Sequence, residues 1–447
     1  MVWKDSVFRS AMTSREKNIS FESSGKTSDC ERLVIFMGGF DPRGARHYHQ
    51  LMRAESQKQP SVSEGRKYAI GSREKWNEGE AAQEKSLHSR WRVSQAGSEN
   101  TASADFVFFD WHDQVRLHWP QSRAEVFRQA LGTYIAVWNL RQWLKPVREQ
   151  ARFTLWALMY PLFYVLLVLL AGIGMGSLLV NLWDGLPKAG AFALMLAVLA
   201  AVCWGGFVLD RYLHISWLLR ILNFAHASSG KTFPVLDARI EAMAAEVAQA
   251  MQQQRWREVV VVGFSVGSVQ ALKLTQALRR KLAEDPLSSH ASRKPLVSLV
   301  TLGNCIPLFA LFPGAGALRQ TLREVAMDDA VYWADISSPS DSVCFGMCDV
   351  VGLSLREDGR KDGAPSVNSV ADSSKRRPQW GFNPQAICSP RFHKLFLPTT
   401  YRWLRRNKMR MHFQYLMAGE VAGAYDYFEL LTSAGPMRDY IERKLVR

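Results

Sequence analysis

Glu258-Val-Val-Val-Val-Gly-Phe-Ser-Val-Gly-Ser268 joins a run of four valines to a glycine-rich turn. The valines predict a strand that is buried on both faces, as in the middle of a parallel sheet. Residues 268–278, which follow, have the apolar spacing of a helix. Gly263 and Gly267 flank Ser265, and their missing Cβ atoms allow a tight turn from strand to helix. The pattern predicts that this turn presents the serine hydroxyl at the carboxyl end of the sheet.

Other apolar runs predict further strands of the same sheet. They lie at residues 32–37, 67–70, 90–93, 105–110, 296–302 and 331–336. Helical spacing occurs between them, at residues 122–144, 237–252 and 318–326. Strands and helices therefore alternate along much of the chain. This order predicts an α/β fold with a doubly wound, mostly parallel sheet.

The amino-acid composition indicates which kind of partner the protein is expected to bind. The 447 residues include 56 Lys and Arg against 41 Asp and Glu, which gives a net charge of +15. This charge suits an anionic partner, and the apolar segments of the chain favour membrane lipid over nucleic acid. The six cysteines are scattered, so we expect no disulfide framework, and Cys344 with Cys348 is too few for a structural zinc site. We expect no metal or organic cofactor.

Two apolar segments predict a transmembrane hairpin. Residues 153–182 carry no charged side chain, and about 30 helical residues at about 1.5 Å each exceed the roughly 30 Å of a hydrocarbon core. A second apolar segment, residues 189–209, follows a short turn. Gly172 with Gly176, and the pair Gly205-Gly206, would allow close helix packing. A hairpin buried inside a soluble protein is the alternative.

The charges around this hairpin predict its orientation. Basic residues flank its outer ends: Arg141, Lys145, Arg148, Arg152, Arg211 and Arg220. The connecting turn holds only Lys188 opposite Asp184. Because positive flanks stay on the cytoplasmic side, both soluble parts and both termini are expected to face the cytoplasm.

The chain thus divides into five predicted segments. A polar N-terminal segment (residues 1–30) precedes the first part of the α/β domain (31–150), the hairpin (151–210), an amphipathic segment (211–232) and the second part of the domain (233–447). Residues 210–224 mix Trp217 and several leucines with Arg211 and Arg220. This mixture predicts an interfacial amphipathic helix, which we expect to act as a lid over Ser265.

The turn at Ser265 resembles the nucleophile elbow of the α/β-hydrolase superfamily, lipases and esterases in particular. The likeness covers the core elements from residue 32 to about residue 415. Its motifs are this turn, a Gly-Gly loop, an aspartate loop and a histidine. The resemblance implies that Ser265 is a catalytic nucleophile; an ordinary glycine-rich turn is the alternative.

The Gly-Gly loop follows the first predicted strand. In the superfamily, an amide of this loop and the amide after the nucleophile form the oxyanion hole. The resemblance therefore implies Gly39 or Phe40, together with Val266, as donors. Met37 stands where many lipases have histidine, so the match is partial. A tight turn without a catalytic role is the alternative.

The superfamily order places an acid and then a histidine after the serine. Ser337-Ser-Pro-Ser-Asp341 is a loop beyond a late strand, which makes Asp341 the predicted acid and Asp335 the reserve. His412 resembles the histidine of the His-x-x-Tyr pattern near the end of some lipases, so it is the predicted base, with His393 as the reserve. A turn residue and structural histidines are the alternatives.

These features together imply a membrane-anchored serine hydrolase that cleaves a carboxylic ester, with a lipid or other acyl ester as substrate. One alternative is a membrane protein that uses a hydrolase-like fold as a binding or assembly platform without catalysis. Another is a soluble thioesterase with an apolar lid. The sequence makes no prediction of the acyl chain, the head group or the oligomeric state.

Overall fold

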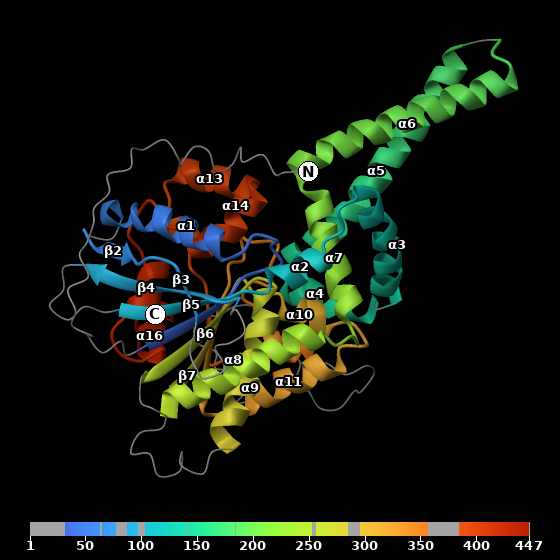
Figure 1. The fold of residues 1–447 in the computed structure, drawn as a ribbon. Helices are drawn as coiled ribbons and strands as arrows, with labels where there is room; N and C mark the ends of the chain where they lie inside the picture. Colours follow the sequence, from blue (N-terminus) through green and yellow to red (C-terminus); the bar gives the residue numbers. More distant parts are fainter. Residues whose placement is uncertain are drawn as a thin grey trace.

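The structure is a computed structural model that describes residues 32–62, 65–76, 87–96, 103–139, 141–183, 185–252, 256–284, 296–355 and 384–446. The polar segment predicted at residues 1–30 lies outside the described residues. Figure 1 shows a body built around a twisted sheet, with a pair of long helices projecting from it.

Within the described residues, nine strands form one sheet. Its order is β2-β4-β5-β1-β6-β7-β8-β9, with β3 paired to β4. The strands are β1 (Arg32–Met37), β2 (Lys67–Ile70), β3 (Glu74–Lys75), β4 (Ser89–Ala96), β5 (Ser103–Phe109), β6 (Glu258–Phe264), β7 (Leu296–Leu302), β8 (Val331–Ile336) and β9 (Ala386–Cys388). The predicted α/β fold is confirmed, but the sheet is mixed, because the pairs β2-β4, β3-β4 and β4-β5 are antiparallel.

Strand β1 lies between β5 and β6 and pairs with both in parallel. The hairpin is inserted between β5 and β6 in the chain. Strands from before and after the hairpin therefore belong to one sheet. The parallel strands β6, β7 and β8 end at the same edge, and the turn that contains Ser265 lies there.

Helices cover both faces of this sheet. They are α1 (Ala45–Ser56), α2 (His112–Leu117), α3 (Arg123–Asn139), α4 (Arg141–Gln150), α5 (Arg152–Leu182), α6 (Lys188–Leu213), α7 (Ile215–Ser228), α8 (Pro234–Gln252), α9 (Gly267–Glu284), α10 (Ile306–Ala310), α11 (Gly316–Met327), α12 (Val350–Ser354), α13 (Pro398–Arg406), α14 (Lys408–Phe413), α15 (Tyr427–Thr432) and α16 (Met437–Lys444). Short 3₁₀ helices span Gln59–Ser61, Phe392–Lys394 and Gln414–Leu416.

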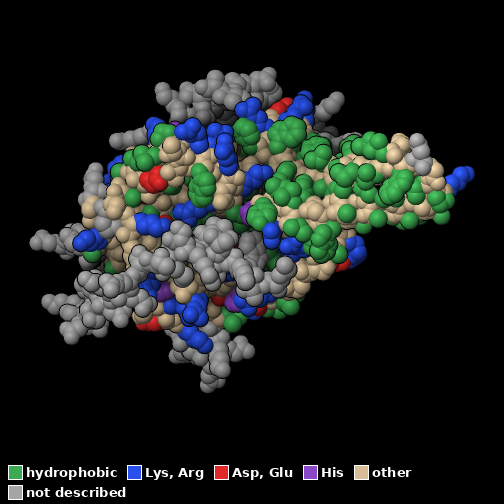
Figure 2. Space-filling view, turned by 90° about the horizontal axis from the view of Figure 1, so that it is seen from above, with side chains coloured by type: hydrophobic (Ala, Val, Ile, Leu, Met, Phe, Trp, Pro, Cys, Tyr) green, Lys and Arg blue, Asp and Glu red, His purple; other side chains and the backbone are tan. Residues whose placement is uncertain are grey.

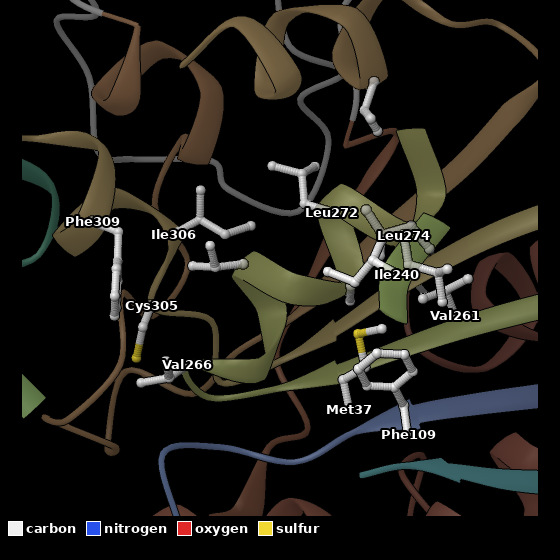
Figure 3. Close-up of a cluster of buried hydrophobic side chains, with 14 of the residues drawn as sticks. Met37, Phe109, Ile240, Val261, Val266, Leu272, Leu274, Cys305, Ile306 and Phe309 are labelled. Carbon is white, nitrogen blue, oxygen red and sulfur yellow. The ribbon is translucent and has the colours of Figure 1, made fainter. Parts of the chain in front are cut away.

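The valines of β6 contribute to both sides of the core. Val259 and Val261 belong to a cluster with α8, α9 and α11, whereas Val260 and Val262 belong to one with α1 and α13 to α16. This division follows from the alternation of side chains along a strand. Figure 3 shows part of the first cluster, where residues of α8 and α9 meet Val261. Burying a valine side chain contributes roughly 1.5–3 kcal/mol, so β6 is a strongly held central strand.

Among the described residues, two helices, α5 and α6, are long and apolar enough to cross a membrane. Only 11% and 6% of their most apolar windows are buried inside the protein. A core hairpin, the alternative, would have these windows enclosed. Figure 2 shows hydrophobic side chains along the outer surface of the projecting pair.

Glycines allow α5 and α6 to pack closely. A Cβ atom at Gly172 would lie 2.7 Å from Leu199 Cδ1. Cβ atoms at Gly176 and Gly206 would also meet side chains of the opposite helix, whereas Gly205 faces open space. The predicted close approach is therefore confirmed at three of these four glycines.

A buried carboxylate fixes the hairpin to the body. Asp210, near the end of α6, accepts hydrogen bonds of 2.7 Å from both the amide and the hydroxyl of Ser216 in α7. The guanidinium of Arg123 in α3 lies 3.7 Å from the same carboxylate. A buried charge is tolerated only when it is paired and hydrogen-bonded. Asp210 therefore ties α3, α6 and α7 together at the base of the hairpin.

Substitution at the hairpin glycines provides a test of this packing. Gly172→Leu is expected to destabilise the protein by roughly 1–3 kcal/mol, because overpacking forces the helices apart. Gly174→Leu, on the same helix but with no neighbour within 4 Å, is the matched control and should melt like wild type. Thermal unfolding in detergent, followed by the circular dichroism of the helices, gives the melting temperature of each variant. Equal melting temperatures in the two variants would show that the helices do not pack as described.

Candidate active site

Ser265 lies on the turn between β6 and α9 in the left-handed conformation, with φ of 56°. This conformation costs a residue with a side chain roughly 1–2 kcal/mol, so its surroundings must hold it in place. A Cβ atom at Gly267 would lie 2.5 Å from the carbonyl oxygen of Gly38, and one at Gly263 would meet the first turn of α9. The predicted tight turn is present, and both flanking glycines are required for it.

The Ser265 side chain is enclosed, with 4% of the residue exposed. Its Oγ lies 3.8 Å from Cys305 Sγ. On another side, a Cβ atom at Gly39 would be 3.4 Å from the same Oγ. Cys305 immediately precedes α10, and its amide donates to Ser268 Oγ at 3.2 Å. The hydroxyl lies at the carboxyl end of the sheet, as expected, and the loop before α10 and the Gly-Gly loop close over it. Figure 3 shows Cys305 near Val266 at one end of the buried cluster.

Cys305 is a neutral neighbour of the serine. Burial raises the pKa of its thiol to about 12. The thiol therefore stays protonated near neutral pH and does not act as a thiolate there. It is a hydrogen-bonding neighbour that helps to define the rotamer of Ser265.

Asp341 and His412 form a buried pair. Asp341 Oδ2 lies 2.7 Å from His412 Nδ1, and each side chain is 1% exposed. The other oxygen of Asp341 accepts a 3.1 Å hydrogen bond from the amide of Val343. An Nδ1–H that donates to the carboxylate leaves Nε2 of a neutral imidazole with its lone pair. That Nε2 is buried and has no hydrogen-bond partner within the described part of the chain.

The histidine lies beside the turn that holds the serine. Its ring centroid is 5.0 Å from that of Phe264, the residue before Ser265. Trp217 of α7 contacts its ring edge-on, with 6.2 Å between centroids. No hydrogen bond joins His412 to Ser265 among the described residues, since the serine hydroxyl contacts Cys305 instead. The predicted acid and base are therefore brought together, and the serine lies next to them without a direct bond.

Two of the three predicted oxyanion donors lie next to Ser265, in space or in sequence. Gly39 is adjacent to Ser265, and Val266 begins the turn into α9. Within the described ranges, the amides of Gly39, Phe40 and Val266 donate no hydrogen bond. The amino-terminal end of α9 also lies here, and its dipole favours negative charge. Their role as oxyanion donors stays a prediction.

Helix α7 covers this site. The ring of Phe224 in α7 stacks on Phe40, with 4.3 Å between centroids and 15° between planes. Residues 215–225 are all buried, and the Asn223 side chain donates to the carbonyl of Val126 in α3 at 2.9 Å. We expected the apolar face of this helix at the lipid interface, but the structure packs it within the protein. An amphipathic pattern does not specify whether lipid or protein covers the apolar face.

The two reserve residues lie elsewhere. Asp335 accepts hydrogen bonds from Thr301, Asn304 and Ser337 at 2.6, 2.7 and 2.7 Å. Burial raises the pKa of its carboxyl to about 6. This carboxyl joins the ends of β7 and β8 and makes no contact with a described histidine. His393 is exposed on the 3₁₀ helix after β9.

An apolar cavity of about 40 Å³ lies near the base of the hairpin, where α3, α4, α5, α7 and α10 meet. Its lining is Val137, Leu144, Val147, Leu155, Leu158, Met159, Leu222, Leu308, Leu311 and Phe312. Leu308 belongs to α10, which begins just after Cys305. Roughly one helical turn therefore separates the cavity from the neighbour of Ser265.

Sequence reasoning missed Cys305. It expected a lid at residues 210–224, but it did not identify the aromatic contacts through which α7 covers the site. A single cysteine after a Gly-Asn turn belongs to no recognisable sequence motif. Its contact with Ser265 arises only because β6 and β7 are neighbours in the sheet. Phe224 and Trp217 were recognised as apolar, but their partners Phe40 and His412 lie far away in the chain.

The chain was compared with models of known protein families, with curated proteins and with solved structures. None of the three comparisons finds a match. Functional inference therefore depends on the geometry described above.

The Asp335 network predicts a pH dependence of stability. A folded-state pKa of about 6, above the ordinary 3.8, means that the folded protein holds this proton more tightly than the unfolded chain. The contribution of this group to stability is complete below about pH 4 and falls as the pH rises to about 6. The loss is on the order of 2–3 kcal/mol. Asp335→Asn has no titrating carboxyl at this position, so its stability should not decrease in this way between pH 4 and pH 6.

Chemical unfolding in detergent at a series of pH values measures the effect. The free energy of unfolding of the variant, minus that of wild type, should rise between pH 4 and pH 6. A difference that stays constant across this range would mean that the Asp335 carboxyl titrates normally in the folded protein.

Proposed function

We propose that the protein is a membrane-anchored serine hydrolase of the α/β-hydrolase type that cleaves a carboxylic ester. The single observation that carries this proposal is the buried Asp341–His412 hydrogen bond beside the strained turn of Ser265. Both β6 and β8 run parallel and end at this edge of the sheet. Helices on both faces are consistent with a doubly wound core extended by the antiparallel strands β2 to β4.

In the proposed reaction, Ser265 Oγ attacks the ester carbonyl carbon. His412 Nε2 accepts the hydroxyl proton and returns it to the departing alcohol, and Asp341 holds the ring and stabilises the imidazolium. The amides of Val266 and of Gly39 or Phe40 receive the oxyanion. Water, activated by the same histidine, then releases the acid. No metal or cofactor takes part in these steps.

Two movements are required before this reaction begins. The Ser265 hydroxyl must rotate from Cys305 towards His412 Nε2, because proton transfer needs a separation of about 2.6–3.2 Å. The cover formed by Phe224 and Trp217 must also open to admit a substrate, since the serine is enclosed. We therefore assign α7 the role of a lid.

The surroundings favour a lipid or other acyl ester as substrate. The hairpin would hold the site close to a bilayer, where acyl esters are abundant. The apolar cavity near α10, at about 40 Å³, is too small for a long acyl chain in the closed state. A long acyl chain gains about 0.8 kcal/mol for each methylene that leaves water. The alternative, a non-catalytic membrane platform, predicts a buried or unpaired Ser265, and the enclosed serine without a bond to His412 fits that prediction. The Asp341–His412 pair favours catalysis.

A fluorophosphonate probe tests the catalytic proposal directly. Detergent-solubilised wild type should be labelled, and Ser265→Ala should not, because the probe reacts only with an activated serine. His412→Ala should slow labelling by roughly 10³-fold or more, since it removes the base. The matched control, His393→Ala, removes an exposed histidine away from the site and should react like wild type.

Two results would contradict the assignment. Resistance of the folded wild-type protein to the probe would favour the non-catalytic platform. Equal loss of reactivity in His393→Ala and His412→Ala would mean that the Asp341–His412 pair is not the base.

The basic flanks support an orientation in which both soluble parts face the cytoplasm. In sealed vesicles whose cytoplasmic side is inward, an impermeant maleimide should label Lys188→Cys in the hairpin turn. It should not label Arg323→Cys on the exposed surface of α11. The opposite labelling pattern would reverse the orientation.

A further inference from the structure

Helix α13 carries an exposed surface that combines arginine with apolar side chains. The exposed residues are Leu397, just before the helix, and Arg402, Trp403, Arg405 and Arg406. Leu404 is buried in the core and fixes which side of the helix faces outward. Leu397 and Trp403 are 56% and 53% exposed. We call these five exposed residues the α13 surface.

Within the described residues, no carboxylate neutralises the charge of this surface. The helix contains no acidic residue. Arg402, Arg405 and Arg406 form no ion pair with a carboxylate of the described chain, although Glu420 lies nearby and accepts the Leu397 amide at 3.1 Å. Arg402 Nε donates to the carbonyl of Pro398 at 3.3 Å. Three guanidinium groups without a carboxylate partner in the described chain, beside an exposed tryptophan, are suited to phosphate groups at a membrane interface.

Two contacts link α13 to the candidate active site and the segment after it to the hairpin. The hydroxyl of Tyr401 lies 2.6 Å from Ser340 Oγ, next to Asp341. Lys408, two residues after α13, has its Nζ 4.1 Å from the ring centroid of Tyr160 in α5. Figure 1 shows α14 beside the base of the hairpin, and Figure 2 shows basic and hydrophobic side chains mixed on the adjoining face of the body.

We propose that the α13 surface docks on anionic phospholipid head groups of the leaflet into which the hairpin inserts. The hairpin tethers this surface close to the bilayer, so docking is an intramolecular event at high effective concentration. The arginines bind phosphate oxygens, and Trp403 with Leu397 enters the head-group region. Docking turns the carboxyl edge of the sheet towards the lipid. This proposal does not depend on whether Ser265 is a nucleophile.

The test uses the full-length protein in nanodiscs of phosphatidylcholine, with or without phosphatidylglycerol. Hydrogen exchange of the peptide that contains α13 reports docking. Exchange is expected to slow by roughly ten-fold or more when phosphatidylglycerol is present, and to recover at high salt. The triple variant Arg402→Gln, Arg405→Gln, Arg406→Gln should lose this protection.

A matched triple variant controls for net charge. It carries Arg257→Gln, Lys281→Gln and Arg443→Gln, which remove the same charge at the opposite edge of the sheet. Arg257 precedes β6, and Lys281 is in the last turn of α9. Arg443 is in α16, whose first amide, that of Met437, donates to Glu258 at the start of β6. This variant should keep the lipid-dependent protection. Thermal melting shows that each triple variant is folded.

Three results would overturn the proposal. The first is equal exchange in neutral and anionic nanodiscs. The second is protection that survives in the α13 triple variant. The third is protection by a soluble acidic peptide in neutral nanodiscs but none by phosphatidylglycerol, which would assign the surface to a protein partner.

Discussion

The close contact between the β6-α9 turn and the end of β1 is the constraint on which the site depends. A side chain at Gly267 would run into the carbonyl oxygens of Met37 and Gly38. Because Gly267 has no side chain, the start of α9 lies directly against the Gly-Gly loop. The same contact holds Ser265 in its strained conformation and brings Gly39 against it. Local strain at the serine is thus maintained by packing of the whole central sheet.

Enclosure is the second feature that defines the site. Phe224 and Trp217, both from α7, cover Phe40 and His412, and the serine and the Asp341–His412 pair are buried beneath them. Charges and dipoles interact more strongly where water is excluded. The helix that closes it is joined to the hairpin through Asp210 and Ser216, so the cover and the apolar helices are mechanically linked.

Much of the sheet was predictable because its strands have clear patterns. The strands Arg32–Met37, Lys67–Ile70 and Val331–Ile336 occur with the predicted bounds. By contrast, β3 and β9 are too short to show periodicity. The pairing of Asp341 with His412 followed from the resemblance, and the structure places them in contact. A lid over Ser265 was expected at residues 210–224, but the contact of Cys305 with the serine was not predictable, because the two residues meet only in the folded chain. The catalytic roles themselves stay predictions.

The position of β1 between β5 and β6 affects how the chain is made. A ribosome delivers β1 to β5 first and then the two apolar helices, and only afterwards β6, the second neighbour of β1. Until β6 emerges, the backbone groups along one edge of β1 are unpaired. Apolar side chains such as Ile35 and Phe36, which are buried in the folded protein, are also incompletely covered. An exposed apolar strand edge readily pairs with other chains. The two apolar helices are therefore synthesised while the sheet is at its most vulnerable stage, and the nascent first half needs protection from aggregation until β6 is made.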